Sequence, residues 1–349
     1  MIIFLLCIML AALPCAGCAQ AADDVWILFV NAKKGDAALI SANGKFHLVD
    51  TGREENADAL VSTLKEYGVD EIEGLFLTHS HNDHTGGLKA VAEAFTIKAA
   101  YRAEFAEANK KGQAKLDKKL GKVGLESTIL SAGDRISLGG DAYAEVLAPT
   151  ELNEDDDNDN SLVLMLHANG HTALLTGDMQ FKEERTLLRR NADVSADILK
   201  VGNHGNPDAT LEEFAEAVNA GIAVISTDTS ADTDSANARV IAALGKAQVF
   251  VTENDPIGVM IGMGKDMKES EQIYANLNMK KTGENIRSRR ERLGMNRPDI
   301  QKKMGLAGVQ SVWNWEKGKK MPNIENLFAL AEILHTTVDD LCVREIVEV

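Results

Sequence analysis

The feature that most constrains this chain is the run HSHNDH at residues 79–84, which directly follows the apolar segment GLFLT. It places His79, His81, Asp83 and His84 within six residues, although the 349-residue chain holds only eight histidines. In an extended segment, residues 79 and 81 point to the same side, so two imidazoles can hold one metal ion. Asp83 and His84 follow where the chain turns back and can hold a second ion. The run therefore predicts a metal centre at the end of a strand.

Cysteine usage limits the kind of metal site. The four cysteines are Cys7, Cys15, Cys18 and Cys342, and residues 19–341 contain none. A disulfide framework and a cysteine-based metal site are thereby excluded from that span. Any metal there is held by histidines and carboxylates, for which one or two Zn²⁺ ions are the default, with Mn²⁺ or Fe as alternatives.

The charge of the chain divides it in two. The net charge is −16, but residues 280–349 carry 13 Lys+Arg and 10 Asp+Glu, a balance of +3, so the remainder carries −19. A negative body argues against one continuous nucleic-acid-binding surface. An asymmetry of this kind indicates two modules with different partners.

The segment that leads to the histidine run has strand character. DVWILFVNAKKGDAALISANGKFHLVDTG predicts three strands, with Asn43-Gly44 as a hairpin turn between the second and the third. A helix is predicted over residues 55–67, followed by the strand GLFLT. The metal-ligand run thus lies within an α/β pattern.

These residues carry a family resemblance. THSHNDHTGGL is similar to the HxHxDH signature of the metallo-β-lactamase fold, and NAKKGDAALI, VDTG, NSLVLML…HTALLTGD and LKVGNHG resemble further motifs in order. They resemble most the branch related to the hydrolase domain of the competence protein ComEC. The resemblance covers roughly residues 24–264. It implies a four-layer αββα sandwich with metals at the strand ends between two sheets.

The resemblance also implies roles. His79 and His81 would hold one metal, Asp83 and His84 the other, and Asp178 would bridge both. The implied metal ligands are His79, His81, Asp83, His84, Asp178 and His204, and the implied catalytic residues are Asp83, His204 and Asp50. Asp50 would orient a ligand from behind, and His204 would be a ligand or a general acid. A hydroxide on the metal would attack a small-molecule ester or a phosphodiester.

Two departures from the family pattern bear on the number of metals. Asn203 stands where the branch has the first histidine of His-His-Gly, and an amide has no proton equilibrium near neutral pH. The later segment STDTSADTDSANARV has no histidine where the branch supplies one, although Ser235 occupies about that position and Asp234 offers an oxygen. A single-metal site, or a degenerate site that only binds, therefore stays open beside the two-metal enzyme.

Other polar features predict structural roles. His47, His167 and His171 match no motif, and we expect packing or surface positions. NEDDDNDN (residues 153–160) lacks the glycine and glutamate of a calcium loop, so an acidic loop is expected. The basic segment 109–124 predicts a solvated surface helix, with attraction of a phosphate beside a substrate cleft as the alternative.

The C-terminal part predicts a small helical module. After a polar linker over residues 265–281, helices are predicted over 282–293, 297–304, 310–317, 324–334 and 338–341. Ile286 and Leu293 are expected in the core. The expected buried face of the fourth helix consists of Ile324, Leu327, Phe328, Ala331 and Leu334, which follow a helical spacing.

This module, residues 282–343, resembles the Cro/C1-type helix-turn-helix family through TGENIRSRRERLGMNRPDIQKKMGL, WEKGKKMPNIENLFALAEIL and TTVDDLCV. The resemblance implies DNA binding, with a dimer on two half-sites. The implied DNA-contacting residues are Arg297, Val309, Gln310, Asn314, Lys317 and Lys319. Gln310 and Asn314 suit bidentate contact with adenine. A helical bundle that binds protein is the alternative.

The N-terminus and the C-terminal module predict different compartments, because DNA and exported proteins lie on opposite sides of a bacterial membrane. Residues 1–22 are uncharged and mostly apolar, and they predict a bacterial export signal, a membrane anchor or a lipoprotein signal with lipid on Cys18. An exported or anchored hydrolase and a cytoplasmic regulator with a ligand-binding metal domain therefore stay open. A third hypothesis is an artefactual or genuine fusion of two reading frames, because MKKTGENIRS from Met279 resembles the start of a free-standing Cro/C1 protein.

Overall fold

The computed structural model describes residues 25–264, 274–277, 279–306, 308–342 and 344–347. The chain divides into two compact units, Met1–Ser270 and Glu271–Val349. The signal or anchor expected at residues 1–22 lies outside the described residues. Among the described helices, none is long and apolar enough to cross a bilayer.

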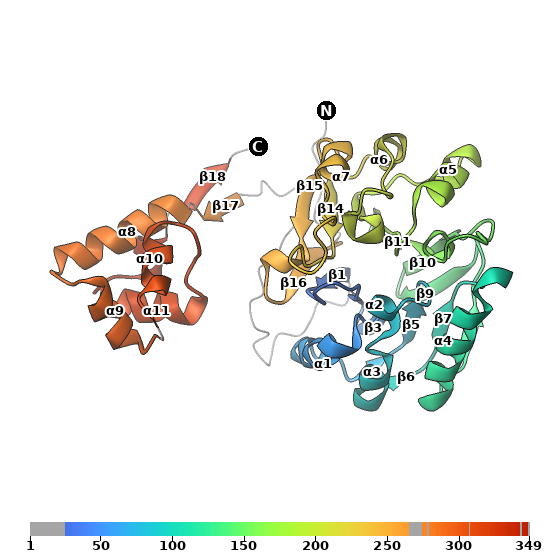
Figure 1. Cartoon of the computed structure of the whole chain (residues 1–349), viewed down its shortest axis with the longest axis horizontal. Coiled ribbons are helices and arrows are strands. Elements are labelled where there is room, and N and C mark those ends of the chain that lie inside the picture. Colours follow the sequence, from blue (N-terminus) through green and yellow to red (C-terminus); the bar gives the residue numbers. More distant parts are fainter. Residues whose placement is uncertain (1–24, 265–273, 278, 307, 343, 348–349) are drawn as a thin grey trace. The chain divides into compact units, whose positions relative to one another are not determined.

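The first unit contains two seven-stranded sheets (Figure 1). The first sheet, in spatial order, is β16 (Gly258–Gly262), β1 (Val25–Val30), β2 (Ala38–Ala42), β3 (Lys45–Val49), β5 (Gly74–Leu77), β7 (Ala100–Arg102) and β8 (Ser127–Ile129). The second sheet is β15 (Gln248–Val251), β14 (Ile222–Ile225), β13 (Ile198–Lys200), β12 (His171–Leu175), β11 (Val163–Ala168), β10 (Ala142–Ala148) and β9 (Arg135–Gly139). A short parallel pair, β4 (Glu71–Ile72) and β6 (Thr96–Ile97), lies apart from both sheets.

Helices cover the outer face of each sheet. The first sheet is covered by α1 (Ala57–Glu66), α3 (Leu88–Ala94) and α4 (Lys110–Lys122), and the second by α5 (Phe181–Arg189), α6 (Glu212–Val218) and α7 (Ala238–Ala243). One hydrophobic cluster fills the space between the sheets, and two more fill the spaces between each sheet and its helices. The result is the expected αββα sandwich, because each sheet has two apolar faces to bury.

Each sheet changes from antiparallel to parallel pairing near the strands that matter for function. β3 pairs in parallel with β5, and β12 pairs in parallel with β13. Because parallel neighbours end at the same edge of a sheet, the loops after β3 and β5 lie at one edge of the first sheet, and those after β12 and β13 lie at one edge of the second. The polar residues of VDTG, HSHNDH, LLTGD and LKVGNHG follow these strands.

The second unit is a helical module. It contains α8 (Met279–Arg292), α9 (Arg297–Met304), α10 (Gln310–Glu316), α11 (Ile324–Ile333) and α12 (Val338–Leu341), flanked by an antiparallel pair of strands, β17 (Tyr274–Leu277) and β18 (Arg344–Val347). The observed elements extend beyond the predicted limits of this domain. β17 and the first turn of α8 lie within residues 265–281, which were predicted to be a linker, and β18 lies after residue 343, where the predicted domain ends. Buried Ile286, Ile300, Trp315 and Leu330 are among the residues of its core.

Two predicted core positions of this module are wrong. Leu293 is 43% exposed, because α8 ends at Arg292 and the chain turns away through Gly294 at φ +69°. Phe328 is 63% exposed, whereas Leu330, which was not assigned to the buried face, is fully buried. The arc of α11 that packs on its neighbours is therefore rotated from the predicted one.

Candidate metal centre

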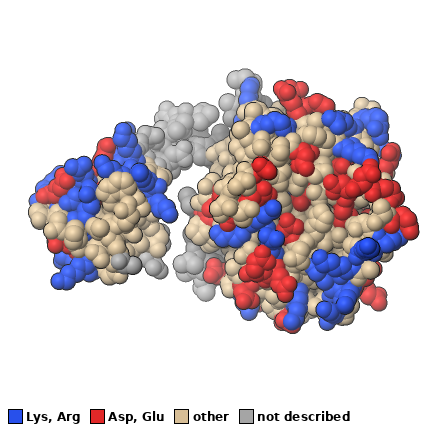
Figure 2. Space-filling model, viewed as in Figure 1, with Lys and Arg blue, Asp and Glu red and all other residues tan. Residues whose placement is uncertain are grey.

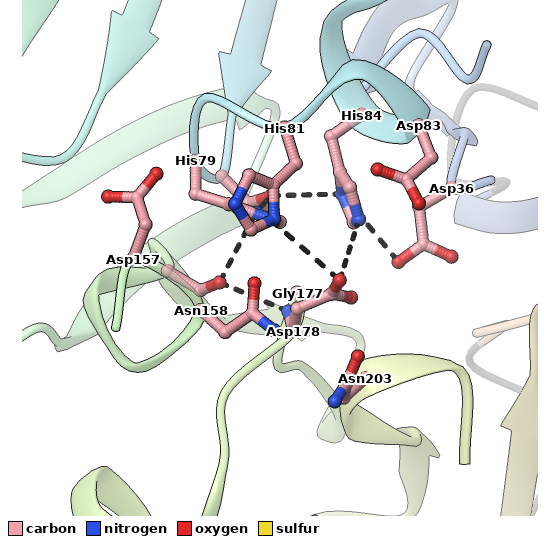
Figure 3. A network of polar contacts seen from close by, with 12 residues as sticks. Asp36, His79, His81, Asp83, His84, Asp157, Asn158, Gly177, Asp178 and Asn203 are labelled. Carbon is pink, nitrogen blue, oxygen red and sulfur yellow. Dashed lines mark hydrogen bonds and ion pairs between the residues drawn. The ribbon is translucent and has the colours of Figure 1, made fainter. Parts of the chain in front are cut away.

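The polar motifs meet where the central strands of both sheets end (Figure 3). Asp50 follows β3, and the run 79–84 follows β5 and forms the short helix α2 (Asn82–Thr85). Asp178 follows β12, and His204 lies in a 3-10 turn, Gly202–Gly205, after β13. The structure thus brings residues from four separate motifs to one place.

Within the residues that the structure describes, four buried atoms of this cluster form no hydrogen bond of good geometry: His79 Nε2, His84 Nε2, His204 Nε2 and Asp178 Oδ1. Asp178 Oδ2 lies 3.0 Å from His84 Nε2, 3.5 Å from His204 Nε2 and 3.8 Å from His79 Nε2. Unpaired buried nitrogens are costly, and ligand atoms bound at about 2.1 Å to one cation lie roughly 3.0–3.4 Å apart. The donor set and its spacing therefore fit a metal ion.

Hydrogen bonds behind the cluster fix the imidazole orientations. His84 Nδ1 lies 2.7 Å from Asp50 Oδ2, and Asp50 also accepts from the backbone N–H and the hydroxyl of Thr78. His204 Nδ1 lies 2.9 Å from the carbonyl oxygen of Ser226. When Nδ1 donates to oxygen, the lone pair is on Nε2, which is the nitrogen that faces Asp178 in both rings. Asp50 thus lies behind His84, and the family resemblance implies a residue that orients a ligand there.

The charges of the cluster depend strongly on one another. Burial acts to raise the pKa of Asp178, but the neighbouring His204 and His84 prevail and hold it well below its usual range. Burial acts to lower the pKa of His84, but Asp178 and Asp50 prevail and hold it well above. Burial and the charge of His84 hold the pKa of His79 well below its usual range. Binding of a dication at His84 would therefore release a proton.

Asp83 and His81 lie at the open side of the cluster. Asp83 Oδ2 is 3.8 Å from His204 Nε2, and the Asp83 side chain is 21% exposed. His81 is exposed, and its ring centroid lies 4.5 Å from that of His79. All six predicted ligands therefore surround one region. One grouping of candidate ligands nevertheless joins His79 with His84 and Asp178, whereas the family resemblance implied that the two histidines hold different metals.

Two buried residues of the site were missed by the sequence analysis. Asp36, on the loop after β1, contacts the ammonium group of Lys200, the last residue of β13. Lys200 also donates to the carbonyl oxygen of Gly177 at 3.0 Å. Both side chains are buried, and Asp36 belongs to groupings that include Asp178, His204 and His84. A signal was present, since a lysine inside the apolar strand DILKV needs a buried partner.

The structure places the substitute residues away from the ligands. The side-chain amide of Asn203 donates to Asp208 Oδ1 at 2.8 Å, on the side away from the histidines (Figure 3). The Ser235 hydroxyl is bonded to Thr227 Oγ1 and to the Asp232 carbonyl oxygen, and Asp234 is exposed. Neither Ser235 nor Asp234 therefore replaces the absent histidine as a ligand.

A buried carboxylate holds the far end of the loop that carries His204. Glu184 accepts the backbone N–H groups of Thr210 at 2.5 Å and Leu211 at 2.7 Å. Burial raises the pKa of Glu184 from 4.5 to about 7. A carboxyl with a raised pKa binds more protons in the folded state, so its contribution to stability falls as pH rises from about 4.5 to 7.

We expect the free energy of unfolding of the wild-type protein to fall over this pH range, by about 3 kcal/mol at most, because of Glu184. In the Glu184→Gln variant this part of the decrease should be absent, because an amide does not titrate. The measurement is denaturant unfolding between about pH 5 and pH 8. Glu213→Gln, at an exposed glutamate of α6, is the control. Parallel pH profiles for the wild type and Glu184→Gln would contradict the assignment.

In the helical module, α9 and α10 form the predicted helix-turn-helix. Val309 precedes α10 and is 40% exposed, and Gln310 Nε2 donates to Asn314 Oδ1 at 3.2 Å on the exposed side of that helix. Lys317 is exposed, and Lys319 Nζ lies 4.6 Å from the centre of the Trp313 ring. These five residues, which were predicted to contact DNA, lie immediately before α10, on α10 and in the loop after it.

Arg297 has a partner that the sequence did not reveal. Its Nε donates to Glu316 Oε2 at 2.7 Å, and its side chain is 31% exposed. Glu316 also accepts from the buried Arg290. Arg297 therefore links the first turn of α9 to α10, and its remaining guanidinium nitrogens are the part available to a phosphate.

Known protein families match the two units of the chain separately. The model of the metallo-beta-lactamase superfamily matches residues 31–229, and a helix-turn-helix model matches residues 286–341. ComE operon protein 3 of Bacillus subtilis is 25% identical over 58% of this chain and 26% of its own length. The chain thus spans about a quarter of that relative.

Two solved structures are similar to one unit each. The metallo-beta-lactamase fold protein YhfI from Bacillus subtilis covers 68% of this chain and 99% of its own, with 14% identity and a TM-score of 0.46. The P22 c2 repressor protein, in complex with a synthetic operator, covers 17% of this chain and 89% of its own, with 35% identity and a TM-score of 0.17.

Proposed function

The chain belongs to the metallo-beta-lactamase superfamily and carries a C-terminal helix-turn-helix domain, and on that premise we propose that it is a metal-dependent hydrolase of phosphodiesters or esters. The observation that carries the proposal is the convergence of three buried imidazole nitrogens, Nε2 of His79, His84 and His204, on the Asp178 carboxylate. A bound Zn²⁺, or Mn²⁺ or Fe in its place, supplies Lewis-acid chemistry and lowers the pKa of water.

The protein's own residues have distinct tasks in this proposal. The residues that would hold the metal are His79, His81, Asp83, His84, Asp178 and His204. Asp50 holds the His84 ring in the orientation that presents Nε2. Asp83 is the partly exposed carboxylate of the cluster, so it can accept a proton from the attacking water and pass it to solvent.

The Asp36–Lys200 pair contributes charge behind the ligands. Lys200 compensates the Asp36 carboxylate, which would otherwise be a second unpaired anion beside Asp178. Its donation to the Gly177 carbonyl also anchors the residue that precedes Asp178. We infer that this pair holds Asp178 in place under the bound metal.

The proposal is tested by removing a ligand at the open side. We expect His81→Ala to lower hydrolysis of a phosphodiester and ester panel by about 10- to 100-fold, with weaker retention of Zn²⁺ or Mn²⁺. Metal content after dialysis and turnover after metal back-titration are measured together. His167→Ala, which removes a half-buried histidine of β11 outside the cluster, is the control. Unchanged activity of His81→Ala would mean that the assigned centre is wrong.

We further propose that the helix-turn-helix domain binds duplex DNA through α10. Support comes from the family match and from the exposed pair Gln310 and Asn314, whose amides suit adenine. Selection from a random duplex pool should return a preferred site. Gln310→Ala should weaken binding to that site by about 1–3 kcal/mol and relax preference at one base pair. An unchanged sequence preference would place base recognition on other residues.

A further inference from the structure

We propose that a stripe of four lysines on α4 binds the phosphate backbone of a nucleic-acid strand and leads it to the metal centre. The stripe consists of Lys111, Lys115, Lys118 and Lys122, all exposed. Spacings of four, three and four residues place them on one side of the helix. The opposite side buries Leu116 and Leu120 against the first sheet.

The side of α4 next to the stripe is docked on the metal-ligand loop. Lys119 Nζ donates to Asn82 Oδ1, to the Thr85 carbonyl oxygen and to the Thr85 hydroxyl at 2.9–3.1 Å. A Cβ at Gly112 would lie 2.6 Å from Ser80 Oγ, and Ser80 stands between His79 and His81. Since residues are about 100° apart around a helix, the stripe adjoins this docked side. The stripe therefore borders the part of α4 that packs on residues 80–85, the loop that carries His81 and Asp83.

The stripe is positive within a negative domain. Figure 2 shows it as a blue patch over α4, among the red acidic groups of the same unit. Other charged side chains of α4 are paired, Lys110 with Glu107 and Asp117 with Arg102. Within the part of the chain that the structure describes, the four stripe lysines form no ion pair. Attraction of a polyanion to this domain therefore depends on local charge.

The spacing of the lysines favours a strand over a single phosphate. At a rise of 1.5 Å per residue the stripe is about 17 Å long, and one strand of DNA presents about five phosphates over that length. The inference rests on the proposed function, because a strand led to this edge meets the groups that would cleave a phosphodiester.

The test is binding without catalysis. The full-length chain is held in chelator, and its affinity for a labelled single strand of about 20 nucleotides is measured against salt. We expect Lys111→Gln/Lys115→Gln/Lys118→Gln to weaken binding by about tenfold or more. The slope of log K against log salt should fall by about 2, since each phosphate contact contributes about 0.7.

The control carries the same charge change elsewhere. Lys45→Gln/Lys65→Gln/Lys246→Gln alters exposed lysines on β3, on α1 and after α7, and should leave affinity within about twofold. Equal weakening in both triples, or none in the stripe triple, would overturn the proposal. So would binding to vesicles that contain phosphatidylglycerol without binding to the strand. The binding experiment measures no turnover, so its failure would contradict the role of the stripe alone. The proposed hydrolase activity is tested separately, by metal content and turnover.

Discussion

Replacing Asp178 with asparagine is expected to empty the metal centre and to lower hydrolysis by about a thousandfold. Among the described residues, Asp178 is the carboxylate that approaches His79, His84 and His204 together. The amide removes the negative charge that favours a dication and leaves three imidazoles facing one another. Loss of the metal's electrostatic contribution, about 4 kcal/mol, corresponds to that factor in rate.

Metal content per chain and turnover are the two measurements for Asp178→Asn, and circular dichroism checks that the sandwich is folded. Asp193→Asn, at an exposed aspartate after α5, is the matched control and should retain both metal and activity. Full metal retention with unchanged turnover would show that the ion is held elsewhere. Full metal retention with lost turnover would show that Asp178 acts in the reaction and is not needed to hold the ion.

The second large effect is expected in the helical module, where Glu316→Ala should destabilise folding by about 3–5 kcal/mol. The Glu316 side chain is fully buried. Its Oε1 accepts from Arg290 Nε at 2.5 Å, and its Oε2 accepts from Arg297 Nε at 2.7 Å. Removal of the carboxylate leaves the buried Arg290 guanidinium without its buried anion and with only the half-exposed Glu291 at 3.4 Å, which is far more costly than loss of an exposed pair.

Denaturant unfolding of the full chain, followed by tryptophan fluorescence, reports on this module because Trp313 and Trp315 both lie in α10. Glu284→Ala is the control, since Glu284 is an exposed residue of α8, where a substitution changes stability by about 0.5 kcal/mol or less. Duplex DNA binding should be lost with folding in Glu316→Ala. Equal stability of the two variants would mean that the buried network contributes nothing.

The candidate metal centre was predictable in part because its candidate ligands lie in short motifs. HSHNDH places four of them within six residues, and the family resemblance added Asp178 and His204, with Asp50 behind them. Asp36 and Lys200 escaped because their pairing joins a loop after β1 to the end of β13, 164 positions apart in the sequence. A local pattern shows that a buried lysine needs an anion but not which one.

The helical module shows the corresponding limit for packing. Helical spacing predicted all five helices within a few residues of their observed bounds. It failed at Phe328, because periodicity defines an apolar arc, and the neighbouring helices decide which part of that arc is covered. The exposure of Leu293 has another cause, since the chain leaves the helix immediately before it.

By itself, the sequence determined the two domain types, because their motifs depend on residue type and near-neighbour spacing, and through the family resemblance it implied the αββα order of elements and six candidate metal ligands. Only the tertiary structure decided which ligand atoms converge on Asp178, that Asn203 turns to Asp208, and that a basic helix lies against the metal loop. These facts depend on side-chain directions at the ends of strands from two sheets, and such directions are set by packing between segments far apart in the chain.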